Sequence, residues 1–430
     1  MKRYELYKDS GVAWIGEIPA HWETVKPKYT MFLQKGTKPQ ELTDEDNGNP
    51  PYLTMDVLRD RANKTTMYPT SVNDLVKVDD GDILVLWDGA NAGEILLAKE
   101  GYLSSTMARF GFDTDKLDSR YWFYFLKGLE PILKEFAGGT TIPHLDSSKI
   151  MEEPYPIPSM EEQQAIVRYL DCKVAKIDKL IAENEAQVKE LEEYRTAVIS
   201  EVVTKGLNPN VPMRDSGIQW IGEIPAHWDI LPLKRCLASH LMYGANETAE
   251  SDNPTFPRYI RITDIGENNT LRKDTYKTLS PSVAKDYMLQ KGDLLFARSG
   301  ATVGKTYLYN GEFEACFAGY LIKASFNSKM LPKYAYYFTQ TDAYNSWKNQ
   351  VFIQATIQNI GADKYSVLPI CVPPIEEQRA IISSIEDRIK NYNIVIEKLS
   401  EQIEELKAYK IALISEAVTG HIDVRDWQEK

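Results

Sequence analysis

The chain repeats itself once, and this duplication constrains its fold more than any other feature of the sequence. Residues 9–22 read DSGVAWIGEIPAHW, and residues 215–228 read DSGIQWIGEIPAHW. Further matches follow in the same order, and they pair 81–93 with 292–304, 158–166 with 373–381, and 194–204 with 409–419. An internal repeat of this length predicts two copies of one structural unit.

Composition narrows the class of protein. The 430 residues are 43% hydrophobic and 11% aromatic, which is typical of folded domains. We find no apolar run of about 18 residues and no signal peptide, so we expect no membrane partner and a cytoplasmic location. The cysteines form no C-x-x-C pair, which argues against a disulfide framework or a zinc site; they are Cys172, Cys236, Cys316 and Cys371. A net charge of −12 means that any nucleic acid must bind through local basic patches.

Each copy ends in a long heptad pattern. Apolar residues recur every 3.5 positions for about five heptads, which is typical of a coiled coil. The inward positions are Val174, Ile177, Ile181, Val188 and Leu191 in the first copy, and Ile389, Ile396, Leu399, Ile403 and Leu406 in the second. Asn184, Arg195 and Lys410 are polar positions in the same stripes, and they either fix the register or rest their stems on the seam.

These patterns predict an α+β protein with two mixed α/β globular domains. Two long antiparallel coiled-coil helices would hold the domains apart about a pseudo-twofold axis. We expect short strands at 52–57, 82–87, 259–265 and 293–297. The predicted parts are domain 1 with its repeat signature at 1–158, helix 1 at 159–205, domain 2 at 206–373, helix 2 at 374–420, and a tail at 421–430.

The tail begins the repeat a third time. Arg425-Asp426 matches Arg214-Asp215, which opens the second copy. We therefore expect residues 421–430 to close toward the N-terminus.

Some motifs resemble catalytic ones. Asn49-Pro50-Pro51-Tyr52 matches the N-P-P-Y motif of adenine-N6 methyltransferases, although a turn leading into a strand explains it equally well. The segment Gly300–Lys305 resembles a phosphate loop but is one residue too short, so we interpret it as a tight turn. His21 and His227 are repeat partners beside a tryptophan, which favours a packing role. We expect no catalytic residue and no metal site.

Basic residues and polar turns give the candidate DNA contacts. Region 24–150 holds 15 basic and 19 acidic residues, and region 231–372 holds 16 and 12, so the second region is the better phosphate binder. The candidates in the first region are Lys35, Lys38, Arg59, Arg61, Lys64, Thr140, Thr141 and His144. Those in the second are Arg258, Arg261, Arg272, Lys273, Arg298, Lys305, Gln354 and Gln358.

Taken together, these motifs resemble the specificity subunit of type I restriction–modification systems. The likeness covers both copies, and it consists of the W-I-G-E-I-P-x-H-W opening, the G-D-[IL]-L strand with its glycine turn, the E-Q-x-x-I helix entry and the A-[VL]-I-S-E-x-V-T helix end. The resemblance implies a non-catalytic DNA-recognition subunit for bacterial defence. Its two globular domains would be target-recognition domains, each of which reads one half of a bipartite site.

The resemblance also implies partners. These are double-stranded DNA, two methyltransferase subunits and two restriction/motor subunits, with S-adenosylmethionine, ATP and Mg²⁺ on the partners and no cofactor on this chain. Two alternatives stay open from the residues alone: an adenine-N6 methyltransferase that uses Asn49–Tyr52, and a coiled-coil scaffold without a DNA role.

Overall fold

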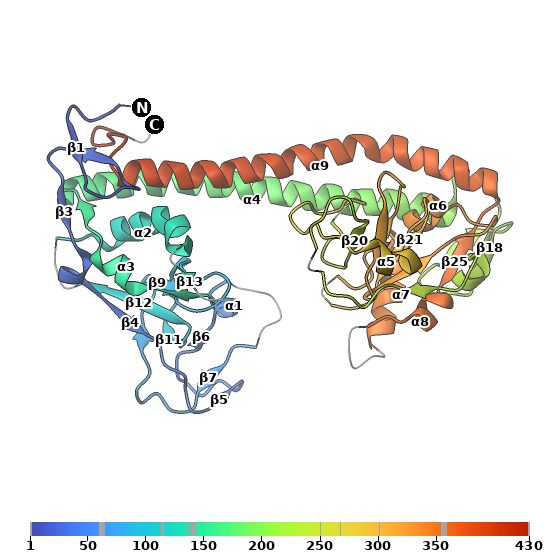
Figure 1. The fold of residues 1–430 in the computed structure, drawn as a ribbon, viewed down its shortest axis with the longest axis horizontal. Coiled ribbons are helices and arrows are strands. Elements are labelled where there is room, and N and C mark those ends of the chain that lie inside the picture. The colour runs from blue at the N-terminus through green and yellow to red at the C-terminus, as the bar shows by residue number, and fades with distance from the viewer. Residues whose placement is uncertain are drawn as a thin grey trace. The chain divides into compact units, whose positions relative to one another are not determined.

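The computed structural model describes residues 2–59, 65–112, 116–135, 137–138, 143–249, 251–266, 268–300, 302–353 and 359–428 (Figure 1). The chain divides into two compact units. The first unit comprises residues 1–185 and 401–430, and the second comprises residues 186–400. Two long helices, α4 (Met160–Lys205) and α9 (Ile375–Val418), contribute to both units.

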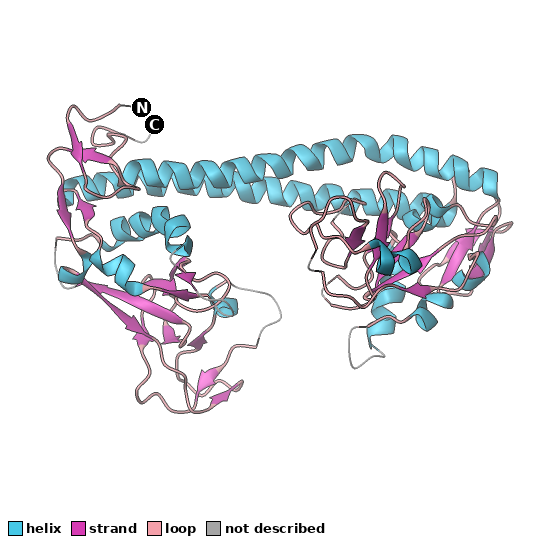
Figure 2. Ribbon diagram, viewed as in Figure 1, coloured by secondary structure: helices cyan, strands magenta, loops and turns pink. Residues whose placement is uncertain are grey.

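The two units contain the same sheet with the same strand order. In the first unit the order is β4 (Met31–Lys35), β12 (Met107–Phe112), β9 (Ile83–Leu86), β10 (Ile95–Leu97). In the second it is β19 (Met242–Tyr243), β24 (Leu321–Ala324), β21 (Leu294–Ala297), β22 (Thr306–Leu308). Both units combine strands with helices (Figure 2). Each unit also has a parallel strand pair, β6 with β11 and β20 with β23. The sequence duplication is therefore a duplication of topology.

The remaining elements complete each unit around its sheet. The strands of the first unit are β1 (Tyr7–Asp9), β2 (Glu17–Pro19), β3 (Glu23–Val25), β4 (Met31–Lys35), β5 (Leu42–Thr43), β6 (Tyr52–Leu53), β7 (Tyr68–Pro69), β8 (Lys77–Val78), β9 (Ile83–Leu86), β10 (Ile95–Leu97), β11 (Gly101–Leu103), β12 (Met107–Phe112), β13 (Ala137–Gly138), β14 (His144–Leu145) and β15 (Tyr155–Ile157). Its helices are η1 (Pro27–Tyr29), α1 (Met55–Leu58), α2 (Ser119–Glu135) and α3 (Ser147–Glu152).

The second unit has fewer strands and more short helices. Its strands are β16 (Met213–Asp215), β17 (Glu223–Pro225), β18 (Asp229–Pro232), β19 (Met242–Tyr243), β20 (Arg258–Ile260), β21 (Leu294–Ala297), β22 (Thr306–Leu308), β23 (Ala315–Phe317), β24 (Leu321–Ala324) and β25 (Pro369–Val372). Its helices are η2 (Leu233–Cys236), α5 (Pro281–Ala284), η3 (Lys285–Tyr287), α6 (Pro332–Phe338), α7 (Asp342–Ile353) and α8 (Ala362–Ser366).

The expected strands at 82–87 and 293–297 occur as β9 (Ile83–Leu86) and β21 (Leu294–Ala297), each one residue shorter at one or both ends. The other two are cut much shorter. The run at 52–57 is a strand only over β6, because α1 begins at Met55. The run at 259–265 is a strand only to Ile260, and a turn follows it. The predicted α+β class with two antiparallel long helices is confirmed.

The long helices run antiparallel within each unit. In the first unit Lys410 Nζ lies 2.6 Å from Asp178 Oδ1, and Lys407 lies 4.0 Å from Glu185. As the residue number rises along α4, the number of the contacting residue in α9 falls, so the two helices run antiparallel. In the second unit Arg195 Nη1 donates to Asn393 Oδ1 at 3.4 Å, in the same sense.

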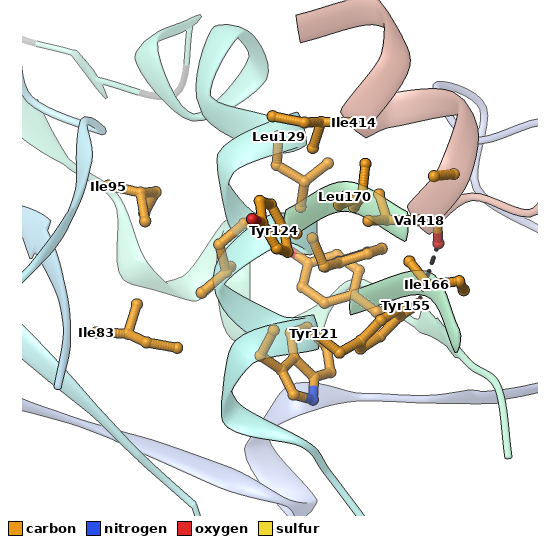
Figure 3. Close-up of a cluster of buried hydrophobic side chains, with 14 of the residues drawn as sticks. Ile83, Ile95, Tyr121, Tyr124, Leu129, Tyr155, Ile166, Leu170, Ile414 and Val418 are labelled. Atoms are coloured by element: carbon orange, nitrogen blue, oxygen red, sulfur yellow. Dashed lines mark hydrogen bonds between the residues drawn. The ribbon is translucent and has the colours of Figure 1, made fainter. Parts of the chain in front are cut away.

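The core of the first unit joins the globular region to both long helices. Tyr121 and Trp122 of α2 are buried against Ile166 and Leu170 of α4 and against Val418 of α9 (Figure 3). The buried Tyr121 hydroxyl donates to the Val418 carbonyl at 3.0 Å, and burial raises the pKa of this phenol. The tyrosine therefore satisfies a carbonyl at the end of α9 that the helix itself leaves unpaired.

A buried glutamine fixes the start of each long helix. Gln163 is fully buried, and its Nε2 donates to the Lys116 and Pro158 carbonyls, each at 2.9 Å. Its Oε1 accepts from the Asp118 N–H at 2.8 Å. Gln378 makes the equivalent three bonds in the second unit, to Lys329 O, Pro373 O and Leu331 N. The shared glutamine thus ties the start of each long helix to the loop that precedes a helix of the globular region.

We predict that Gln163→Leu lowers the stability of the first unit by about 3 kcal/mol or more. Leucine would leave three buried backbone groups without partners, and each such group costs about 1–3 kcal/mol. Urea unfolding followed by tryptophan fluorescence measures the effect. Gln164→Leu is the matched control because Gln164 is exposed. Equal unfolding midpoints for the two variants would contradict this role.

The chain ends meet in the first unit. The Asp423 N–H donates to the Lys2 carbonyl at 2.9 Å, and Lys2 Nζ lies 2.8 Å from Asp426. Arg425 stacks on the Tyr4 ring at 4.8 Å and pairs with Asp423, whose pKa its hydrogen bond lowers. Residues 420–427 therefore pack on the N-terminal segment of the same unit.

Candidate nucleic-acid interface

In the first unit, charged and aromatic side chains gather where β4 and β9, the two strands on either side of β12, end. Lys35 is the last residue of β4, and its Nζ lies 5.3 Å from the Trp87 ring, directly after β9. Lys35 also pairs with Asp88 at 3.1 Å. His144 of β14 bonds to the same carboxylate through Nδ1, and its Nε2 accepts from Trp87 Nε1 at 3.0 Å. Two of the sequence candidates, Lys35 and His144, thus meet around residues that the sequence analysis did not single out.

The carboxylate at this cluster is held ionised. Burial by itself would raise the pKa of Asp88, but hydrogen bonds from His144 and Lys35 together lower it below its ordinary value. The side chains of Lys35 and His144 are exposed at this edge. Both ring nitrogens of His144 are engaged, so the cluster presents the remaining ammonium donors of Lys35 and an indole ring beside a fixed acceptor. Such a set can contact base edges and phosphates.

The second unit has an aromatic–cation pair at the corresponding place. Tyr243 is the last residue of β19, and the guanidinium of Arg298 lies 4.9 Å from its ring, directly after β21. The Arg298 backbone is fixed on both sides, since its N–H donates to Tyr320 O at 3.0 Å and its carbonyl accepts from Ile360 N at 2.8 Å. Ser299 forms a β-bridge with Asn359, as Asp88 does with His144.

The two clusters have the same backbone arrangement but carry different side chains at the matched positions. Trp87 and Arg298 occupy the same position in the matched segments 81–93 and 292–304. Gly36 and Gly244 follow the two edge residues, and a Cβ at either would lie 2.2 Å from a backbone carbonyl of the neighbouring segment. Cation and ring are thus swapped between the strands, with Lys35 over Trp87 in one unit and Arg298 over Tyr243 in the other. The repeat alignment was the signal that could have identified Trp87.

Of the other candidates in the first region, the structure describes two and leaves four outside the described residues. Lys38 is exposed, whereas Arg59 pairs with Glu94 and is partly buried. The remaining candidates lie outside the described residues; they are Arg61, Lys64, Thr140 and Thr141.

In the second region, two arginine candidates are used within the domain. Arg258 donates to the Arg272 carbonyl at 2.7 Å and stacks on Tyr276 and Phe313. Arg261 forms a two-pronged pair with Asp264, at 3.0 and 3.1 Å, and donates to Thr275 O. These contacts fold the segment that follows β20 onto the strand. The Arg261 guanidinium is therefore fully engaged, and that of Arg258 is held by one hydrogen bond and two rings, although its Nε has no partner among the described residues.

Two further candidates, Arg272 and Lys273, stay available at the surface. Arg272 and Lys273 are exposed and make no ion pair with the described residues. Lys305 lines a cavity of about 150 Å³ together with Lys348, whose pKa burial lowers. Gln354 and Gln358 lie outside the described residues.

The motifs that resemble catalytic ones form turns and core. Asn49 Nδ2 donates to Pro69 O at 3.0 Å, and Tyr52 is buried. Tyr259 occupies the same strand position in the second unit, where its hydroxyl donates to Ala245 O at 2.7 Å. The backbone N–H groups of Val303 and Gly304 donate to Gly300 O and Ala297 O, so the described residues of the phosphate-loop-like segment form a tight turn.

The duplicated histidine–tryptophan pair anchors the repeat opening to the long helix. His21 Nε2 lies 2.9 Å from Glu162 of α4, and Trp22 Nε1 lies 3.4 Å from it. In the second unit Glu377 of α9 receives His227 at 2.9 Å and Trp228 at 3.0 Å. The H-W dipeptide and the E-E-Q helix entry are thus two halves of one contact in each unit.

The predicted seam positions lie on the inward sides of the helices. Every one of the ten is buried or half-buried; they are Val174, Ile177, Ile181, Val188, Leu191, Ile389, Ile396, Leu399, Ile403 and Leu406. Asn184 is also buried, and its Nδ2 has no partner among the described residues.

Comparison with known proteins identifies the family. The model of the type I restriction modification DNA specificity domain matches residues 19–192 and again residues 243–405. The chain belongs to this family. The two matches cover the two copies of the repeat, so each unit of this specificity subunit corresponds to one specificity domain.

Relatives and a solved structure agree with this assignment. The chain is 28% identical over 424 residues to the type I restriction enzyme MjaVIII specificity subunit of Methanocaldococcus jannaschii, covering 95% of both chains. It is 21% identical to the EcoBI specificity subunit of Escherichia coli, over 90% of this chain and 82% of that one. A chain from a structural study of type I R-M system assembly and conformational transition has the same fold, with a TM-score of 0.57, 14% identity and coverage of 93% of this chain and 98% of that one.

Searches for other kinds of site gave negative results. Within the described ranges we find no group of three or more histidine, cysteine, aspartate or glutamate side chains placed to hold a metal ion. No helix in the described part of the chain is long and apolar enough to cross a membrane.

Proposed function

We propose that the two specificity domains of this subunit read two different halves of a bipartite double-stranded DNA target. The observation that carries this proposal is the pair of clusters at matched strand ends, Lys35–Trp87 and Tyr243–Arg298. Two domains that have the same backbone but different side chains at matched positions can contact different base sequences.

Two methyltransferase subunits are the partners that we propose for the long helices. Apolar side chains are exposed at matched positions in the two copies, where Leu180 corresponds to Val395 and Tyr194 to Tyr409. All four are 44–52% exposed. Because large exposed apolar side chains on a helix mark interaction surfaces, their duplication supports two equivalent docking surfaces, one in each unit.

The rest of the complex follows from the same assignment. We propose that this chain is not an enzyme and acts in the cytoplasm. Two restriction/motor subunits would join the complex, and S-adenosylmethionine, ATP and Mg²⁺ would bind to the partner subunits. The use of Asn49 and Tyr52 within turn and core supports recognition over methylation by this chain itself.

The test is the methylated sequence in cells. Cells that express this chain with its partner methyltransferase should carry methylated adenine at a site with two unlike halves and a gap of fixed length and free sequence. The half-site centres should lie about one helical turn apart, because that spacing places two grooves on one face of the duplex. Cells with the methyltransferase alone are the control. Methylation at a single undivided motif would refute the bipartite reading.

A further inference from the structure

The arginine at the end of β21 is distinguished by donors that no described residue accepts. Four arginines have a buried Nε atom without a hydrogen-bond partner among the described residues: Arg109, Arg195, Arg258 and Arg298. The first three donate from another guanidinium nitrogen, whereas the guanidinium of Arg298 makes no hydrogen bond to a described residue. Arg261, by contrast, is fully engaged by Asp264 and Thr275. A half-buried guanidinium with unmatched donors costs free energy unless a ligand supplies the acceptors.

The guanidinium is also held in place. It stacks on the Tyr243 ring at 4.9 Å, and that ring is fixed because its hydroxyl accepts from the Ala362 N–H at 3.0 Å. Backbone bonds to Tyr320 and Ile360 fix the main chain of Arg298. Stacking leaves the edge of a guanidinium free to donate two parallel bonds in its own plane.

A base is a better ligand for this edge than a phosphate. Both halves of a DNA target carry phosphates, so a phosphate contact would favour a cation at this position in both copies. The first copy has Trp87 there instead, and its cation is Lys35 at the end of β4, on the far side of β12. A position whose side chain differs in chemistry between two copies of the same backbone is expected to contact bases rather than phosphates.

We infer that Arg298 is a specificity-determining residue that reads a guanine in the half-site of the second domain, with Tyr243 as its positioning residue. Guanine offers O6 and N7 as paired acceptors in the major groove, and arginine meets them with two hydrogen bonds. The inference rests on the proposed function, because it requires that the second domain reads DNA.

The experiment uses the complex of the full chain with its methyltransferase on duplexes that carry the wild-type target and each single base-pair change. Arg298→Lys keeps the charge but loses the two-pronged geometry. We expect it to reduce discrimination at one guanine of one half-site by roughly 5- to 150-fold, the range of such a contact. Tyr243→Leu should relax the same position, and Trp87→Ala should alter only the other half-site.

Controls separate the possible outcomes. Lys273→Ala, at an exposed lysine, should weaken binding to all duplexes equally if it has any effect. Co-purification with the methyltransferase and near-ultraviolet circular dichroism verify that each variant is folded. If Arg298→Lys keeps full discrimination at every position, or weakens all duplexes equally, the guanine assignment is wrong. The proposed function fails separately, if the wild-type complex itself shows no bipartite target.

Discussion

Deleting residues 188–194 together with 394–400 is expected to shorten the gap in the methylated target by about three base pairs. Each deletion removes one heptad, or about 10 Å of helix at 1.5 Å per residue, and a base pair rises about 3.4 Å. The two segments face each other in the antiparallel pair, since Arg195 and Asn393 follow and precede them in register. Both half-sites should stay unchanged, because no residue of either sheet is removed.

Methylome sequencing of cells with the shortened chain measures this directly. The control deletes residues 188–194 alone, which puts the two seams out of register and should abolish methylation. An unchanged gap in the doubly shortened chain would show that the helices do not set the spacing.

Replacement of Ile403 by aspartate is expected to abolish assembly with the methyltransferase while the sheets stay folded. Ile403 is a buried seam residue of α9 in the first unit. Its burial contributes about 1.5–3 kcal/mol, and an unpaired carboxylate at the same place adds a desolvation cost of several kcal/mol. The seam should therefore open locally, and a partner docked on the helices would lose its surface.

Co-purification and circular dichroism measure the two parts of this result. Gln402→Asp is the matched control, because it introduces the same charge at the exposed neighbouring position. Full assembly and full methylation by the Ile403→Asp chain would show that the seam or the docking surface has been misplaced.

The succession of globular regions and long helices along the chain was predicted well from the sequence, because repeated motifs and heptads mark it. The helices were expected at 159–205 and 374–420, and α4 and α9 begin one residue later. Heptads and the E-E-Q entry carry this information locally. The strands at 52–57 and 259–265 were over-extended because short parallel pairs depend on partners far away in sequence, such as Tyr102 opposite Tyr52.

The candidate site was harder to predict, because charge alone does not reveal where an arginine finds its acceptor. Arg258 and Arg261 resembled DNA contacts in the sequence, yet a carbonyl and a carboxylate within the same domain engage them. Asp264, three residues after Arg261, was a local hint of that pair. Trp87 carries no charge, so a search for basic residues passed over it.

The division of the chain has a consequence for its synthesis. The second unit is one continuous stretch, 186–400, whereas the first unit needs both 1–185 and 401–430. Leu413, Ile414 and Val418 belong to the core of the first unit, and Asp423 bonds to Lys2. A nascent chain can therefore complete its second unit while the first still lacks part of its core. The unit whose synthesis begins first is therefore completed last. Until residues 401–430 are made, its exposed apolar residues are prone to aggregation unless chaperones bind them.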